Sequence, residues 1–187
     1  MNFAPAGSLK GMDTKNLADL YDLAPLAWAD CVAALDAGYT QAPDTGGPNR
    51  HSTWLATIDA DGSPHVTGVG SLWVDGAFFF ETGRTSRKGR NIARDPRCTL
   101  SLAMHDFDLI VEGEAELVTD PDVVADIAAR YAADSWPARV DESGTALTAE
   151  FSAPSAGPPP WHVYRVVPKT ATVVSTIEPG GATRFDF

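Results

Sequence analysis

Three strand-like runs joined by two tight turns constrain this chain more than any other feature. The runs are STWLATI at 52–58, SPHVTGVGSLWV at 63–74 and AFFFET at 77–82, and they are rich in β-branched and aromatic residues. The links between them, DADG and Asp75-Gly76, have the composition of hairpin turns. This pattern predicts an antiparallel meander of three strands, and the rest of the fold must be built around it.

Further strand signals extend this meander towards a barrel. They are CTLSLAM at 98–104, LIVEGEAELV at 109–118, WHVYRVVP at 161–168 and TATVVSTI at 170–177, and the chain ends with TRFDF. In the second of these runs glutamates alternate with apolar residues, which is typical of a strand with one wet and one buried face. Six or seven short strands with few helices indicate a mainly β chain (α+β), namely a small antiparallel barrel with peripheral helices.

Helix signals are few, and the length suits one domain. We expect a helix from Pro25 to Gly38, a short one over 86–93 and a third that begins at Asp120-Pro121. Residues 1–20 are expected to form a flexible tail and residues 21–187 a single domain. The breaker-rich segment 137–160 is either a mobile flap over a site or a surface linker, and the pattern favours the linker.

The run FFFETGRTSRKGRNIARDPR, residues 78–97, predicts an anion site. A strand leads into a turn that opens a helix, so the hydroxyls of Thr82, Thr85 and Ser86 lie near the first N–H groups of that helix. Arg87 and Lys88 add positive charge there. Six of the fourteen Lys and Arg residues lie between 84 and 97, although the formal net charge of the chain is −11. Such a local excess of positive charge indicates a discrete anionic ligand.

Composition excludes several other classes. An acidic chain argues against nucleic acid as a partner, because nucleic-acid-binding proteins use broad basic faces. Cys31 and Cys98 lie far apart, and the four histidines form no metal motif, so no metal site is predicted. No apolar run has the length of a membrane span and the first residues lack a signal-peptide core, so we expect a soluble, cytoplasmic protein.

Two glycines in the second strand of the meander suggest close approach by another molecule. Gly68 and Gly70 weaken a strand interior, and a flat ring that lies against the strand would need this clearance. A barrel bend or bulge also recruits glycine, so both interpretations stand. The position beside the anion site favours a ligand that carries both a phosphate and a planar ring.

The run from Thr53 to Ala103 resembles the pyridoxamine phosphate oxidase-like split-barrel flavoproteins, a group that includes flavin and deazaflavin oxidoreductases. The similar motifs are LATIDADGSPHV, TGVGSLWV, FFFET, TSRKGRN and DPRCTLSL, and TRFDF is similar to the usual ending of these proteins. The resemblance implies a homodimer of split barrels with two cofactor sites at the subunit interface. It also implies that Thr67, Gly68 and Val69 line the ring and that Thr82, Ser86, Arg87 and Lys88 hold the phosphate, with Asn91 either in the polar shell or on the surface.

Departures from the family pattern bear on the substrate. Pyridoxamine phosphate oxidases place an arginine where Thr67 stands, and Arg184 is the only basic residue in the ending GGATRFDF. The resemblance therefore argues against vitamin B6 oxidation. It favours hydride transfer between a cofactor and a small organic substrate, with no residue required as a nucleophile.

The predicted cofactor is the deazaflavin F420, with FMN as the alternative. Both offer a ring and a phosphate, but F420 has the longer anionic tail, which the spare charges of Arg84, Arg90 and Arg94 would suit. Arginines on the outer face of a helix are also commonly solvated or paired. Two further hypotheses remain, namely a non-catalytic flavin- or haem-binding store or sensor, and a phosphate-ligand protein unrelated to flavins.

The aromatic residues of the third strand predict a contact surface. Phe78 and Phe80 share one face and Phe79 occupies the other, so both faces are apolar. A face left over after the barrel is filled would serve as a dimer surface. Trp161 either belongs to the core or covers the ring held by a neighbouring subunit.

Overall fold

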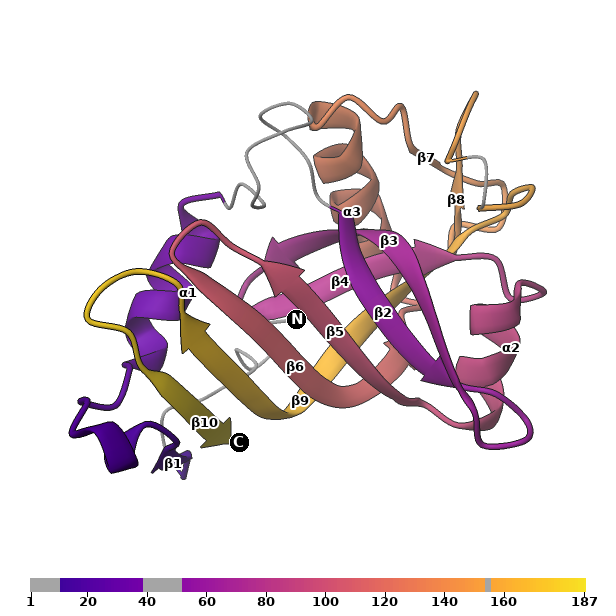
Figure 1. The fold of residues 1–187 in the computed structure, drawn as a ribbon. Coiled ribbons are helices and arrows are strands. Elements are labelled where there is room, and N and C mark those ends of the chain that lie inside the picture. Colours follow the sequence, from indigo (N-terminus) through magenta and orange to yellow (C-terminus); the bar gives the residue numbers. More distant parts are fainter. Residues whose placement is uncertain (1–10, 39–51, 154–155) are drawn as a thin grey trace.

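The chain folds into a closed antiparallel β-barrel with helices at its edges, as Figure 1 shows for a computed structural model that describes residues 11–38, 52–153 and 156–187. The sheet runs in the order β1 (Asp13–Asn16), β10 (Ala182–Asp186), β9 (His162–Ser175), β4 (Ala77–Thr82), β3 (Pro64–Val74), β2 (Ser52–Ile58), β5 (Arg97–Ala103) and β6 (Phe107–Leu117). Because β6 also pairs with β9, six of these strands close the barrel and β10 and β1 extend it. The predicted mainly β fold is confirmed.

The predicted meander forms β2, β3 and β4. Its second turn has positive φ at both central residues, 49° at Asp75 and 80° at Gly76, which is the conformation that matches the twist of a hairpin. The β2–β3 ladder is continuous from Ser52 opposite Gly70 to Ile58 opposite Pro64. The meander is therefore a regular platform, with no register shift along β2 and β3.

The last part of the barrel differs from the prediction, because the two runs expected as separate strands form one long strand, β9. Its first half pairs with β4 up to Val166, and its second half pairs with β10 from Thr170 onwards. Pro168, which has no N–H to donate, lies between these two partners and beside the register shift at Glu112/Gly113 of β6. A Cβ on Gly113 would lie 2.1 Å from the Val167 carbonyl oxygen, so glycine permits the close crossing there.

Helix α1 (Trp28–Asp36) begins three residues after the predicted start at Pro25. The delay has a local cause, since the Leu26 N–H donates to Thr183 Oγ1 at 2.8 Å and ties the preceding segment to β10. Trp28 and Leu35 are buried in the barrel core. Residues 13–16 of the expected tail form β1 on β10, and a 3-10 turn follows at Asp19–Tyr21.

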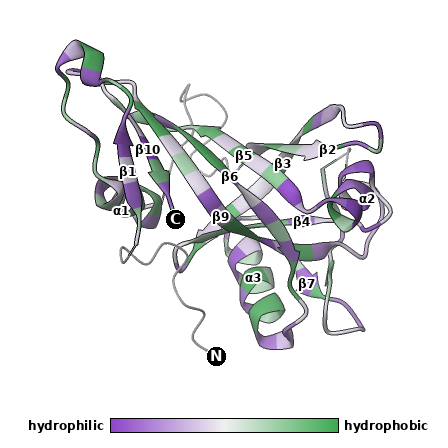
Figure 2. Cartoon of the chain, turned by 90° about the horizontal axis from the view of Figure 1, so that it is seen from below, coloured by the Kyte–Doolittle hydropathy of each residue, from purple (hydrophilic) through white to green (hydrophobic). Residues whose placement is uncertain are grey.

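Two further helices, α2 (Arg87–Arg94) and α3 (Pro121–Ala133), flank β4. Figure 2 shows that α2 is largely hydrophilic, whereas α3 carries hydrophobic turns. Phe79 lies beneath α3 with Val124 and Ile127, while Phe78 and Phe80 fill the barrel. The outward face of β4, which the sequence offered as a dimer surface, is thus covered by α3. No helix in the described ranges is long and apolar enough to span a membrane.

The segment 137–160 is more structured than the predicted linker. It contains the small hairpin β7 (Arg139–Val140) and β8 (Leu147–Thr148), and two backbone hydrogen bonds join Leu147 to Trp161. Trp161 is 2% exposed and belongs to the second core, which confirms the core interpretation for this residue. The linker interpretation is wrong because these buried contacts anchor the segment to α3 and β9.

Candidate functional site

A groove of about 240 Å³ lies where β3, β4, α2 and the end of segment 137–160 meet. It is lined by Gly68, Val69, Gly70, Glu81, Thr82, Lys88, Ala153 and Ala156. Four of these residues, Gly68, Val69, Thr82 and Lys88, were predicted from the sequence as ligand contacts. The two alanines show that segment 137–160 reaches the groove, which is where the flap interpretation placed it.

The hydroxyl groups of the predicted cradle are close together. Thr82 Oγ1 and Ser86 Oγ share a hydrogen bond of 2.9 Å, and Ser86 caps α2 by accepting from the Gly89 N–H at 3.0 Å. The turn before α2 is tight, since a Cβ on Gly89 would lie 2.3 Å from the Gly83 carbonyl oxygen. This geometry sets the first turn of α2 beside the groove, where helix N–H groups favour an anion.

Lys88 supplies the positive charge of the groove. Its side chain is buried, and this burial lowers the pKa of the ammonium group, while the charge of Glu81 raises it. An ammonium group removed from water is costly unless a negative partner compensates it. Lys88 is therefore a strong candidate to bind an anionic ligand.

Glu81 is a groove residue that the sequence reasoning missed. Burial raises the pKa of its carboxyl group to about 7, against the opposing effects of a hydrogen bond from Tyr131 and the charge of Lys88. The available signal was a carboxylate inside the otherwise apolar run AFFFET, directly before Thr82. A single carboxylate in a strand usually faces solvent, so the sequence pattern did not identify Glu81 as a groove residue.

Because side chains alternate between the two faces of β3, the three residues predicted to line a ring do not all face the groove. Val69 is buried in the barrel core, so only its main chain can face the groove. Thr67 lies opposite Leu55 and is half-buried. Gly68 is exposed on the outer face, where an added Cβ would meet nothing within 4 Å. The β2–β3 register is continuous, so Gly68 does not mark a bulge. The open space beside Gly68 instead favours the interpretation that another molecule approaches the strand there.

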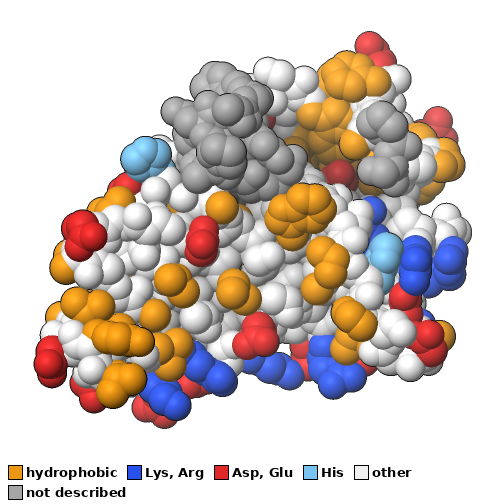
Figure 3. All heavy atoms as spheres, in the orientation of Figure 1, with side chains coloured by type: hydrophobic (Ala, Val, Ile, Leu, Met, Phe, Trp, Pro, Cys, Tyr) orange, Lys and Arg blue, Asp and Glu red, His pale blue; other side chains and the backbone are white. Residues whose placement is uncertain are grey.

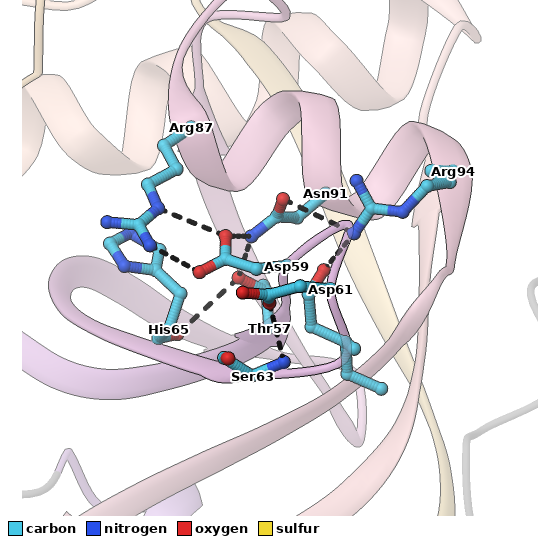
Figure 4. A network of polar contacts seen from close by, with 9 residues as sticks. Thr57, Asp59, Asp61, Ser63, His65, Arg87, Asn91 and Arg94 are labelled. Atoms are coloured by element: carbon cyan, nitrogen blue, oxygen red, sulfur yellow. Dashed lines mark hydrogen bonds and ion pairs between the residues drawn. The ribbon is translucent and has the colours of Figure 1, made fainter.

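Arg87 and Asn91 contact the β2–β3 hairpin (Figure 4). Arg87 Nε donates to Asp59 Oδ1 at 3.0 Å, and Asn91 Nδ2 donates to Asp59 Oδ1 at 2.9 Å and to Thr57 Oγ1 at 3.1 Å. The hydrogen bonds from Arg87 and Asn91 lower the pKa of Asp59 to about 2. Asn91 is 3% exposed, so the surface alternative for this residue is wrong. Both residues fix α2 to the hairpin.

The spare arginines lie around α2, and Figure 3 shows basic side chains gathered at this end of the molecule. Arg90 donates to the Thr85 carbonyl and Arg94 to the Ile58 carbonyl, so each already holds the backbone. Arg84 is exposed. Burial, and after it the charge of Arg84, lowers the pKa of His162. His162 faces Thr82 across the β4–β9 ladder and has a buried Nδ1 without a hydrogen-bond partner among the described residues.

The six-stranded closed barrel with a groove beside a short capped helix is the architecture of the split-barrel proteins. A family model described as pyridoxamine 5'-phosphate oxidase matches residues 46–175, about 70% of the chain. The chain belongs to this family.

Within the described ranges, no group of three or more His, Cys, Asp or Glu side chains could hold a metal ion.

Curated relatives agree with this assignment. The pyridoxine/pyridoxamine 5'-phosphate oxidase of Alcanivorax borkumensis is 30% identical over 137 residues, which are 65% of this chain and 66% of that protein. The protein of the same name from Paraburkholderia phymatum is 32% identical over 175 residues, 81% of this chain and 82% of its own length. The chain thus spans just under two thirds of the first of these relatives.

Two solved structures share the fold at low sequence identity. A pyridoxamine 5'-phosphate oxidase-related, FMN binding protein from Nostoc punctiforme has a TM-score of 0.56 at 15% identity, with 86% of this chain and 91% of that chain covered. PhzG from Burkholderia lata, in complex with tetrahydrophenazine-1-carboxylic acid, has a TM-score of 0.54 at 15% identity, with 85% and 83% covered.

Proposed function

We propose that this protein is an oxidoreductase that binds F420 or FMN in the groove and transfers a hydride between the cofactor and a small organic substrate. One observation carries the proposal: the open, side-chain-free surface at Gly68 borders the buried ammonium of Lys88 and the hydroxyls of Thr82 and Ser86. A ring and a phosphate would find adjacent sites there. Membership of the family and the likeness to an FMN binding protein support the proposal.

Each groove residue has a defined role in this proposal. Thr82, Ser86 and Lys88 bind the phosphate through charge-assisted hydrogen bonds, and Gly68 with the main chain of Val69 lies against the ring. Arg87 and Asn91 hold α2 against the hairpin through Asp59, which keeps Lys88 in place. Hydride chemistry is supplied by the cofactor when it is bound, so the chain itself provides binding, orientation and electrostatics.

The C-terminal strand informs the choice of substrate. Arg184, the only basic residue of the ending, donates from Nε and Nη2 to its neighbour Asp186 at 3.0 and 2.8 Å. Thr67 carries no charge at the position where the resembled oxidases place an arginine. We infer a substrate without a phosphate group, such as a conjugated organic molecule, in place of a vitamin B6 phosphate.

We further propose that the protein is a homodimer through the outer face of β2, β5 and β6. Trp54 is 57% exposed and lies in one row with Gly68, Ser101 and Ile110 across the four strands β3, β2, β5 and β6. Figure 3 shows hydrophobic side chains spread over this face. Since the row begins at Gly68, a second copy on this face would also border the groove.

The choice of F420 depends on Arg84, because Arg90 and Arg94 already bind carbonyl groups. Titration of the purified protein with FMN and F420 side by side, followed by fluorescence, tests binding, and nicotinamide- or F420-linked reduction assays test turnover. We expect tight binding of one coenzyme and reductase activity. Failure to bind either coenzyme would overturn the proposal, and binding without turnover would indicate a store or sensor.

A further inference from the structure

The carboxyl group of Glu81 lies in the wall of the groove and has one close hydrogen-bond partner on α3. Glu81 Oε2 is 3.1 Å from the hydroxyl oxygen of Tyr131, and that hydroxyl is also 3.2 Å from the Gly70 carbonyl oxygen. Gly70 and Glu81 both line the groove beside Lys88. Three elements thus bring an acid, a phenol and a carbonyl oxygen together at one end of the site.

Hydrogen counting distinguishes the two protonation states of this cluster. The Tyr131 hydroxyl has a single hydrogen, so it can donate to Glu81 or to the Gly70 carbonyl, but not fully to both. An ionised Glu81 takes this hydrogen and leaves the Gly70 carbonyl without it. A protonated Glu81 donates its own hydrogen and allows Tyr131 to donate to Gly70. The neutral acid therefore satisfies this cluster better.

Few charges compensate an ionised Glu81. A backbone hydrogen bond at Glu81, the hydroxyl of Tyr131 on α3 and the charge of Lys88 on α2 favour its ionised form. Its neighbour on β9 is the apolar Val163, β3 contributes a glycine, and Ala153 and Ala156 line the groove beyond. An anion bound at Lys88 would place a second negative charge in the same groove and would share the ammonium group with Glu81.

We propose that the groove binds its anionic ligand together with one proton, which the Glu81 carboxylate takes up from solvent to become a neutral hydrogen-bond donor. This inference rests on the proposed function, because it concerns the same groove. It assigns Glu81 as the residue whose protonation removes a negative charge from the groove, and Tyr131 as the residue that positions it. Lys88 then faces the anion without a competing carboxylate.

The test is the pH dependence of coenzyme affinity, with FMN and F420 as the probes. Because burial raises the pKa of Glu81 to about 7, a bound state that keeps the proton predicts that Kd rises about 15-fold between pH 7.0 and 8.5. The phosphate of FMN is mostly dianionic above pH 7, so the ligand itself adds little to this change. Calorimetry in two buffers should show uptake of about 0.8 proton at pH 7.5.

Glu81→Gln keeps the size of the side chain and should make Kd independent of pH over this range. The matched control is Glu178→Gln, which alters an exposed carboxylate in the turn between β9 and β10 and should behave as the wild type. Tyr131→Phe removes a hydrogen bond that lowers the pKa of Glu81, so the loss of affinity should begin at higher pH.

The outcomes separate the two proposals. If neither coenzyme binds the wild-type protein at any pH, the proposed function and this inference both fail. If a coenzyme binds with a pH-independent Kd and without proton uptake, only the role of Glu81 is overturned. A pH dependence that persists unchanged in Glu81→Gln also overturns this inference alone.

Discussion

Substitution of Gly68 by valine should separate ligand binding from stability. An added Cβ at this position meets nothing within 4 Å, and Gly68 lies in a regular antiparallel ladder opposite Trp54. Packing within the chain therefore does not require glycine there. If the glycine serves a ligand ring, valine should be harmless to the fold and harmful to binding.

The magnitudes follow from this open position. Glycine inside a strand costs about 0.5–1 kcal/mol relative to residues that suit a strand, so Gly68→Val should raise Tm by about 1–4 °C for a chain of this size. The new isopropyl group stands where the ring would lie. Such overpacking costs about 1–3 kcal/mol, which corresponds to an affinity about 5- to 150-fold weaker.

The assay combines thermal unfolding without ligand, light scattering and the FMN and F420 titrations. Ala182→Val is a control, since it places a valine on β10, outside the groove and outside the proposed dimer face. Unchanged coenzyme affinity in Gly68→Val would refute the reasoning that a ring lies against β3. A lower Tm without ligand would show that the second copy, and not a ligand, requires the clearance.

Three further substitutions test the predicted anion site, the proposed dimer surface and the hydrogen bonds of Asn91 that hold α2 against the β2–β3 hairpin. Lys88→Met removes a charge-assisted contact of about 1.5–3 kcal/mol, so coenzyme titration should give about 10- to 150-fold weaker binding, and a change below twofold would contradict it. Trp54→Glu should give monomers by light scattering at micromolar concentration where the wild type is dimeric; an unaltered dimer would argue against this face. Asn91→Ala leaves Thr57 and Asp59 without their amide donor, which should cost about 1–3 kcal/mol and lower Tm; an unchanged Tm would show that the clamp does not stabilise the fold.

The sequence predicted those features that local chemistry determines. Asp75-Gly76 specifies its hairpin, and Ser86 caps α2, because each depends on the conformational preferences of a few neighbouring residues. The prediction of two separate strands in place of β9 was wrong, because the continuity of β9 depends on its pairing with β4 and β10, which are distant from each other in the sequence. The buried setting of Asn91 likewise depends on Thr57, 34 residues away.

The position of the groove follows from the length of α3. The outer face of β3 and β4 is apolar at Leu72 and Phe79, where α3 covers it. This cover ends at Tyr131 in the last turn of the helix, next to Gly70 and Glu81, and beyond it the outer face of β3 carries Gly68 and then the exposed Val66. The half-buried Glu81 and the open position at Gly68 therefore lie at the same boundary because one helix stops there. A ligand that covers β3 and β4 beyond the end of α3 would contact both Gly68 and Glu81. Substitution of Gly68 and the pH dependence that Glu81 causes therefore test the same binding site.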